Sequence, residues 1–342
     1  MFNSPGANAN AVKELVVCGL LLASRGIVEG ILHTKALYKD PANDKEKIKK
    51  RIEDDKKMFV GQELTGKRLG VVGLGHIGAS VAKAALDLGM NVSGYDPGLS
   101  VETAWTLPGH KMQRKNSLMA LLEGADYISL NVPYSKSTHH IIGRSELKAM
   151  KPNCHLVNFA RGELVDTSAL RAMYDSKELT GRYVTDFPDE HLTDCSHAIC
   201  IPHLGASTEE AESNSAAMAA NQIVNFIETG AIVNSVNFPK TVLDRPPQAG
   251  ARLAIVNRNV PGMLGLITST VGAAGLNISQ QINTSRDDIA YTVVDLSDMP
   301  EPALTKKLQE DLAKIDGVIS SRLIEASEAL QPRYFRVSED GE

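Results

Sequence analysis

Three side chains at widely separated positions have the types needed for acid–base chemistry on an anionic substrate. Arg161 lies in the stretch NFARGELVD, Glu190 in DFPDEH and His203 in IPHLGAST. A histidine exchanges protons near neutral pH, and a neighbouring carboxylate favours its protonated form. A guanidinium binds a carboxylate through two parallel N–H···O bonds and polarises the adjacent carbonyl. These groups together suit oxidation of a 2-hydroxy acid, in which the histidine takes the hydroxyl proton as a hydride leaves carbon.

Each of these residues also has an ordinary structural interpretation. Taken alone, His203 is more often a structural histidine, Glu190 a loop acid and Arg161 a surface charge after a turn. The catalytic hypothesis therefore depends on whether the surrounding elements deliver the three side chains to one place.

Apolar strands alternate with short helices between residues 66 and 202, which is typical of βαβ units on a parallel sheet covered on both faces. The expected strands are KRLGVVG, NVSGYD, YISLNVP, CHLVNFA, RYVTDF and HAICIP, and the expected helices are HIGASVAKAALDLG, SLMALLEGA, RSELKAM and DTSALRAMYDSKEL. Six such strands predict a doubly wound α/β Rossmann sheet. Ligands of this fold bind beyond the carboxyl ends of the strands. Arg161, Glu190 and His203 all follow strand ends, so we expect them to converge there.

The stretch GLGHIG between the first strand and its helix matches the pattern GxGxxG. Gly73 allows the tight turn, Gly75 lets a pyrophosphate approach the backbone, and Gly78 lets the helix pack on the strand. Asp96 follows Gly78 by 18 residues, at the end of the second strand. A carboxylate there accepts hydrogen bonds from the ribose hydroxyls and repels a 2′-phosphate. The pattern therefore predicts NAD as cofactor, in preference to NADP, and requires no metal.

The segment before the sheet predicts one amphipathic helix over roughly residues 8–33, with Asn8 or Asn10 capping its start. Its apolar run LVVCGLLLA is too short to span a membrane, and its flanks are wrong for a signal peptide. Residues 40–60 are dense in charges of both signs and predict a solvated helix or loop.

The C-terminal part predicts a long helix over residues 205–230, ended by Gly230, followed by a proline-bearing linker. The elements that follow are ARLAIVNRN, a helix opening on Pro261, LNISQQINTS, IAYTVVDL, PALTKKLQEDLAKI and VISSRLIE. This order is βαββαβ, a ferredoxin-like sandwich.

Composition excludes some classes of function. The 342 residues carry a net charge of −5, with 43% hydrophobic and 23% charged residues. This balance disfavours a nucleic-acid or anionic-membrane partner. The four cysteines form no CxxC pair, and they are typical of reduced thiols in a cytoplasmic protein.

The motifs NFARGELVD, DFPDEH and IPHLGAST, together with GLGHIG, resemble the D-isomer-specific 2-hydroxyacid dehydrogenases over residues 3–237. The resemblance implies that Arg161 binds substrate, Glu190 pairs with His203, and His203 exchanges the proton. It also implies NAD contacts from His76, Ile77, Asp96, Phe159, Ala160, Arg161, Asp186, His203, Leu204, Gly205 and Ala206. The family usually has DVFxxEP, whereas DFPDEH is one residue tighter and lacks the proline. Asp189 is therefore a rival to Glu190.

The C-terminal module resembles an ACT regulatory domain over residues 250–325, through NRNVPGMLG and GLNISQQ. The resemblance implies a serine effector held by Asn259 and Asn277 between subunits of a homo-oligomer. Asn257 stands where serine-inhibited relatives often carry histidine, which weighs against serine sensitivity. A βαββαβ unit with an open sheet edge could equally serve dimerisation alone.

The two resemblances together imply oxidation of 3-phospho-D-glycerate to 3-phosphohydroxypyruvate, the first step toward serine. The alternatives are another D-2-hydroxy acid, such as glycerate or lactate, and a non-catalytic regulator that binds NAD or an amino acid. The run NSPGANANAVKELV resembles the segment after an N-terminal substrate lobe in the family, so we expect that lobe to be missing here. The expected divisions are 1–36 (linking helix), 37–206 (Rossmann), 207–248 (return helix and linker), 249–326 (ACT) and 327–342 (tail).

Overall fold

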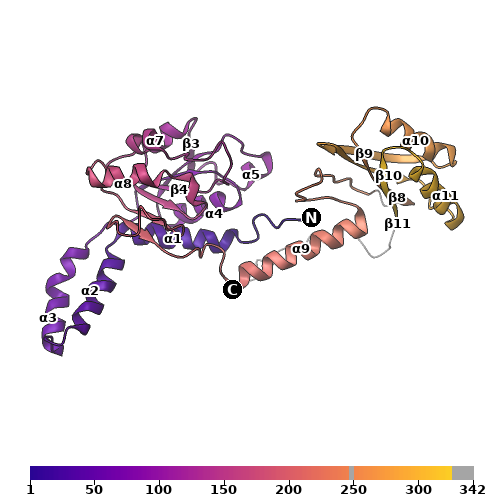
Figure 1. Ribbon diagram of the computed structural model, residues 1–342. Coiled ribbons are helices and arrows are strands. Elements are labelled where there is room, and N and C mark those ends of the chain that lie inside the picture. Colours follow the sequence, from indigo (N-terminus) through magenta and orange to yellow (C-terminus); the bar gives the residue numbers. More distant parts are fainter. Residues whose placement is uncertain (246–249, 326–342) are drawn as a thin grey trace. The chain divides into compact units, whose positions relative to one another are not determined.

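The computed structural model describes residues 1–245 and 250–325 and divides into two compact units (Figure 1). One unit comprises residues 6–215. The other comprises residues 1–5 and the chain from residue 216 onward. The expected tail, 327–342, and the end of the expected linker lie outside the described residues.

Parallel strands in the described part of the first unit form a seven-stranded sheet, in the order β3-β2-β1-β4-β5-β6-β7. The strands are β1 (Arg68–Val72), β2 (Asn91–Tyr95), β3 (Met112–Arg114), β4 (Tyr127–Leu130), β5 (His155–Asn158), β6 (Tyr183–Thr185) and β7 (Ala198–Cys200). The direction of strand progression reverses between β1 and β4, which is the switch point where ligands bind in this fold. The predicted doubly wound Rossmann sheet is confirmed.

Helices bury both faces of this sheet, which explains why its strands are apolar on both sides. On one face, α1 and α4 contribute Val16, Leu20 and Val81 to a core that includes Val71 and Val157. On the other face, α6, α7 and α8 pack against the alternate strand residues. The bounds of these helices are α1 (Ala9–Ser24), α4 (His76–Asp87), α6 (Leu118–Leu122), α7 (Arg144–Ala149) and α8 (Thr167–Asp175).

The edge strand β3 and the helix α5 (Val101–Thr106) before it were not among the predicted elements, so the expectation of six strands was wrong. Strand β3 is only three residues long, too short for any hydrophobic period to show. It exists because it pairs with β2, through a register that sets Arg114 opposite Gly94.

The predicted single helix over 8–33 was also wrong, because the chain breaks after Ser24 into α1 and α2 (Ile27–Lys39). Arg25 is extended, and the Arg182 guanidinium donates to the carbonyls of Leu22 and Arg25, at 3.0 and 2.8 Å. A cation at these carbonyls ends α1. Asn8 occupies the N-cap position without a side-chain cap bond, and Asn10 instead donates to Glu14 at 2.9 Å, so neither serves as the predicted cap.

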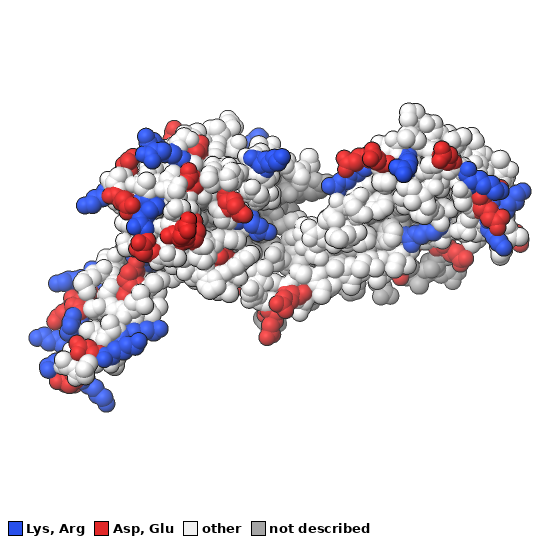
Figure 2. Space-filling view, viewed as in Figure 1, with Lys and Arg blue, Asp and Glu red and all other residues white. Residues whose placement is uncertain are grey.

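Helix α2 and helix α3 (Lys45–Asp55) form a hairpin that extends away from the sheet and ends in the 3-10 turn η1 (Lys56–Phe59) (Figure 1). Side chains of both charges crowd its far end (Figure 2), as expected for the solvated helix or loop predicted over 40–60. No single helix among the described residues has the length and apolar composition to cross a membrane; α1 and α2 meet that test only together, as a pair bent by 68°.

The second unit contains the predicted βαββαβ arrangement. Its described strands form a four-stranded antiparallel sheet, in the order β11-β8-β10-β9. Its elements are α9 (Glu209–Thr229), shared with the first unit, β8 (Ala251–Arg258), α10 (Met263–Ala273), β9 (Ile278–Arg286), β10 (Ile289–Leu296), α11 (Pro302–Ala313) and β11 (Val318–Glu325). Gly230, with φ of 73°, ends α9 as predicted. Helix α10 does not open on Pro261, because Gly262 adopts φ of 88° and becomes the N-cap.

Candidate active site

The glycine-rich turn after β1 has the backbone geometry that its sequence predicts. Gly73 has φ of +85°, and a Cβ there would lie 2.7 Å from the carbonyl oxygen of Asn131. A Cβ on Gly78 would lie 1.9 Å from the Gly73 carbonyl oxygen, so helix and strand meet without a side chain. A Cβ on Gly75 would meet nothing within 4 Å, which leaves open space beside the turn.

This open space lies at the N-terminus of α4, where backbone N–H groups have no partners within the helix. Gly75 is the N-cap and has no side chain to occupy them. The amides of His76 and Ile77 are in this first turn. Free N–H groups and the helix dipole together favour an anion such as a pyrophosphate. The residues predicted to hold the cofactor phosphates therefore fit that group.

Asp96 follows β2 and lines a pocket of ≈ 460 Å³. Its two carboxylate oxygens accept hydrogen bonds from the backbone N–H groups of Leu74 and Gly98, each at 2.8 Å. Each oxygen keeps a lone pair for a ribose hydroxyl. The sequence reading missed the rest of the lining, which comes from the turn after β2, from α5 and from β3: Pro97, Leu99, Ser100, Val101, Ala104, Trp105 and Arg114.

The turn that carries Arg161 is held by a residue that sequence reasoning missed, the fully buried Asn158. The Asn158 amide donates to the carbonyl of Arg161 at 2.8 Å and to the Tyr183 hydroxyl at 3.0 Å, while its side-chain oxygen accepts from the Ala160 N–H at 3.1 Å. Arg161 is extended and exposed, and its Nη1 donates to the Ala160 carbonyl at 2.6 Å. An asparagine at the end of a buried strand is the signal that could have identified it. Phe159, which follows Asn158 in the same turn, is buried at 5% exposure.

Asp186 anchors the turn that carries His203. Its Oδ2 accepts from the N–H groups of Leu204 and Gly205, at 3.1 and 3.0 Å. Its Oδ1 is buried and has no hydrogen-bond partner in the described part of the chain. Because a buried carboxylate oxygen normally has a donor, this atom is suited to accept an N–H from a bound molecule. The NAD contact that the family resemblance implies for Asp186 fits this observation.

Phe187 connects the two catalytic candidates. Its Cβ lies 3.2 Å from the position that a Cβ on Gly162, the residue after Arg161, would occupy. Its ring centroid lies 4.7 Å from that of His203. The Arg161 turn and the His203 ring therefore flank one aromatic side chain at the carboxyl edge of the sheet. Sequence reasoning assigned Phe187 no role, although it directly follows Asp186.

The structure does not bring Glu190 to His203. The Glu190 side chain is 90% exposed, and its ionic neighbour is His191 at 4.0 Å. Asp189 accepts a hydrogen bond from the His191 N–H at 2.9 Å. Burial raises the pKa of the nearby Cys200 thiol, and the charge of Asp189 raises it further. The pairing of either carboxylate with the imidazole stays a prediction.

The two predicted effector residues both lie in the second unit. Asn259 donates to the carbonyl of Asp287 at 3.1 Å, and Asn277 donates to the Ser297 hydroxyl at 3.0 Å. Asn257 is buried, and its side-chain oxygen accepts from the Thr292 hydroxyl at 3.0 Å.

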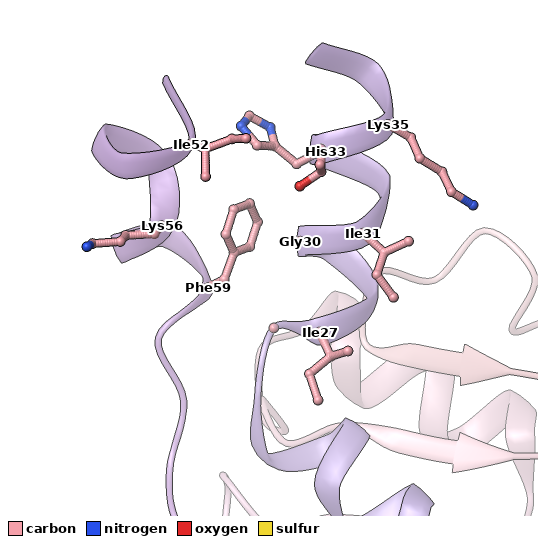
Figure 3. A pocket seen from close by; sticks show the side chains of 10 residues that line it. Ile27, Gly30, Ile31, His33, Lys35, Ile52, Lys56 and Phe59 are labelled. Atoms are coloured by element: carbon pink, nitrogen blue, oxygen red, sulfur yellow. The ribbon is translucent and has the colours of Figure 1, made fainter. Parts of the chain in front are cut away.

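A second groove, of ≈ 530 Å³, lies on the α2–α3 hairpin and contains none of the predicted site residues. Phe59 and Ile52 point from one side of it toward Gly30 and His33 on α2 (Figure 3). The Asp55 carboxylate accepts a hydrogen bond from His33 Nε2 at 2.9 Å. The lining of this groove is mainly apolar.

The chain belongs to the D-isomer specific 2-hydroxyacid dehydrogenases, a family of NAD-dependent dehydrogenases, because the profile of that family's NAD-binding domain matches residues 33–205. Among curated relatives, D-3-phosphoglycerate dehydrogenase of Escherichia coli K12 is 32% identical over 335 residues, covering 95% of this chain and 75% of that protein. The enzyme of the same name from Dictyostelium discoideum is 30% identical over 336 residues, with the same coverage.

Solved structures of dehydrogenases share this fold. Rhodotorula graminis D-mandelate dehydrogenase matches with a TM-score of 0.55 at 28% identity, covering 66% of this chain and 64% of that one. A glyoxylate reductase from Paecilomyes thermophila matches with a TM-score of 0.57 at 27% identity, covering 69% and 67%. The chain thus spans about two thirds of the length of these structures.

Proposed function

We propose that this chain oxidises 3-phospho-D-glycerate to 3-phosphohydroxypyruvate, with NAD as the hydride acceptor. The observation that supports this chemistry is the position of Phe187, whose side chain lies near both Gly162, the residue after Arg161, and the His203 ring. The D-3-phosphoglycerate dehydrogenases among the relatives support this choice of substrate.

In this proposal the chain's own residues bind the substrate and move one proton. The Arg161 guanidinium binds the substrate carboxylate through two parallel N–H···O bonds and polarises the adjacent carbon–oxygen bond. The imidazole of His203 accepts the hydroxyl proton and returns it in the reverse direction. Glu190 pairs with the resulting imidazolium. NAD supplies the carbon that accepts the hydride.

The direct test is to mix the folded protein with NAD and a panel of 2-hydroxy acids and to follow NADH absorbance. We expect NADH with 3-phospho-D-glycerate. NADH with D-glycerate or D-lactate in its place would identify another member of the substrate class. Calorimetric binding of NAD without NADH from any substrate would reject the catalytic proposal in favour of a non-catalytic regulator.

We predict that His203→Ala reduces kcat by at least about a hundredfold, because general acid–base catalysis contributes roughly 10²–10⁴-fold. NAD affinity should change little, since the backbone N–H groups of Leu204 and Gly205 remain bound to Asp186. Stopped-flow NADH formation and calorimetric NAD titration measure the two quantities. His191→Ala, which removes a nearby half-exposed imidazole, is the control and should retain activity. Near-normal turnover of His203→Ala would place the base elsewhere.

We also propose that the second unit is an ACT regulatory domain that binds serine through Asn259 and Asn277. Its βαββαβ order supports this assignment. Calorimetry with serine, on the parent protein and on Asn259→Ala, tests it. We expect a heat of serine binding with the parent protein and none with Asn259→Ala. If the parent shows no heat of binding, the module has a role in assembly alone.

We further propose that the chain forms a homo-oligomer. Helix α2 and the segment around η1 expose large apolar side chains, including Leu32 at 62%, Tyr38 at 67% and Val60 at 79%. Such a surface is typical of an interface between protein chains. Light scattering on the parent and on Leu32→Lys tests this proposal. A monomeric parent would reject it.

A further inference from the structure

The pocket beside Asp96 contains a cation that the NAD proposal leaves without a role. In the parallel register of β2 and β3, Arg114 lies directly opposite Gly94, and the Lys115 N–H donates to the Gly94 carbonyl at 2.8 Å. Neighbouring strands are about 5 Å apart. Arg114 therefore ends its strand next to the turn where Asp96 follows β2, and both residues line the same ≈ 460 Å³ pocket.

The Arg114 guanidinium is unpaired in the described part of the chain: neither a carboxylate nor a carbonyl binds it. Asp96, by contrast, has each oxygen bound to a backbone N–H. The next residue, Lys115, lies outside the pocket lining, and its ammonium donates to Gln113 at 3.4 Å. The pocket thus combines an anchored negative charge, a free positive charge and the apolar side chains of Leu99, Val101 and Trp105.

We propose that Arg114 is a specificity-determining residue that can bind a phosphate on the 2′-oxygen of the cofactor's ribose, and that the Asp96 carboxylate alone opposes this binding. This inference rests on the proposed NAD site. A phosphate monoester would meet both side chains, because the ribose hydroxyls are expected at Asp96. A guanidinium binds phosphate oxygens bidentately, whereas the carboxylate repels them. Removing the carboxylate should therefore convert the pocket to NADP without any added cation.

The chain provides its own reporter for this test, because its single tryptophan, Trp105, lines the pocket. We suggest titrating the full-length protein with ADP and with adenosine 2′,5′-bisphosphate while following Trp105 fluorescence, at low and at high salt. The variants are Asp96→Ala, Asp96→Ala with Arg114→Gln, and Asp96→Ala with Lys115→Gln as the charge-matched control. Asp96→Asn serves as a second background, because it keeps one acceptor oxygen for the turn.

We expect the parent to bind ADP more tightly than the bisphosphate. Either Asp96 substitution should strengthen bisphosphate binding by about tenfold or more, since a hydrogen-bonded charge pair has an effect of this order. Arg114→Gln should cancel that gain and leave ADP affinity nearly unchanged, whereas Lys115→Gln should not cancel it. High salt should weaken the bisphosphate complex more than the ADP complex.

Equal effects of Arg114→Gln and Lys115→Gln would overturn the proposal, since the contribution would then be general surface charge. An Asp96 variant that gains no affinity for the bisphosphate would also overturn it. A parent that binds neither nucleotide would instead reject the NAD site on which the inference rests.

Discussion

Asp189 and Glu190 are adjacent carboxylates in the loop after β6, and their hydrogen bonding differs. Asp189 accepts the N–H of His191 at 2.9 Å, a bond from the side chain to the backbone two residues on that stabilises a turn. Glu190 accepts no backbone hydrogen bond in the described structure, and its side chain is 90% exposed. Glu190 has the longer side chain and is not bound to the loop backbone. It is therefore the better candidate to pair with His203, although it does not do so here.

We predict that Glu190→Gln lowers kcat/KM by roughly tenfold or more, because the imidazolium formed in the reaction then lacks a carboxylate partner. Asp189→Asn keeps an acceptor oxygen for the turn and should retain the parent's kcat/KM. Initial rates of NADH formation measure both. If Asp189→Asn lowers kcat/KM and Glu190→Gln does not, the assignment must be reversed.

Among the elements, the amino ends of β4, β5 and β6 form a junction that holds α1 and α2 in place. The His155 ring stacks on Tyr127 with centroids 4.8 Å apart, and the Tyr127 hydroxyl bonds to Ser24 at 2.9 Å. The Nδ1 atom of His155 accepts the N–H of Arg182 at 3.0 Å. Burial, together with the smaller effects of the Arg182 and Lys67 charges, lowers the pKa of His155 to about 4.

This junction predicts a loss of stability in mild acid. The pKa of His155 is about 4 in the folded chain, against 6.5 when unfolded, so the unfolded chain binds more protons between these values. The contribution of the neutral His155 ring to the free energy of unfolding is complete above pH 6.5 and is lost as the pH falls toward 4. It amounts to about 3 kcal/mol, at 1.36 kcal/mol for each pKa unit. Urea unfolding at pH 7.5 and pH 5 should show the decrease.

The control for this prediction is His155→Asn, which offers an acceptor to the Arg182 N–H but cannot gain a proton. Its stability should fall less between the same two pH values. A parallel fall in the parent and the variant would mean that other groups titrate in this range.

At the scale of the whole molecule, the two units have separate hydrophobic cores. The second unit also contains a buried ion pair: Arg252 and Asp295 are 1% and 0% exposed and meet through two bonds of 2.6 and 2.8 Å. Arg252 donates further to the carbonyls of Thr229, at the end of α9, and Leu243, both at 2.8 Å. This side chain therefore ties the linker and the helix end to the sheet.

We predict that Arg252→Met destabilises the second unit by about 3–5 kcal/mol, because it leaves the Asp295 carboxylate buried without its cation. Scanning calorimetry should show one transition moving to lower temperature, while the transition stabilised by NAD stays in place. The double variant Arg252→Met with Asp295→Leu removes both charges and should recover much of the loss. A single transition that moves as a whole would show that the units unfold together.

Much of the first unit could be predicted because its signals are local. Gly73 and Gly78 reveal their roles through the absence of a Cβ, and the apolar runs that became β1, β4 and β5 are buried on both faces. The candidates Arg161, Glu190 and His203 followed from one rule, that the ends of parallel strands share an edge. Glu190 shows the limit of that rule, because a residue beyond the strand end is positioned by its loop.

The sequence by itself determined the alternation of strands and helices, the glycine turn and the residue types available for proton transfer, since these depend on backbone conformation and hydrophobic period along a continuous segment. Only the tertiary structure decided where α1 ends, which residue holds the Arg161 turn and that Arg114 lies beside Asp96. The end of α1 depends on Arg182, which is far along the chain. The Arg161 turn depends on the buried amide of Asn158, which bridges two strands. The position of Arg114 depends on β3, an edge strand of three residues. Such contacts form only when separate segments pack, so no local pattern encodes them.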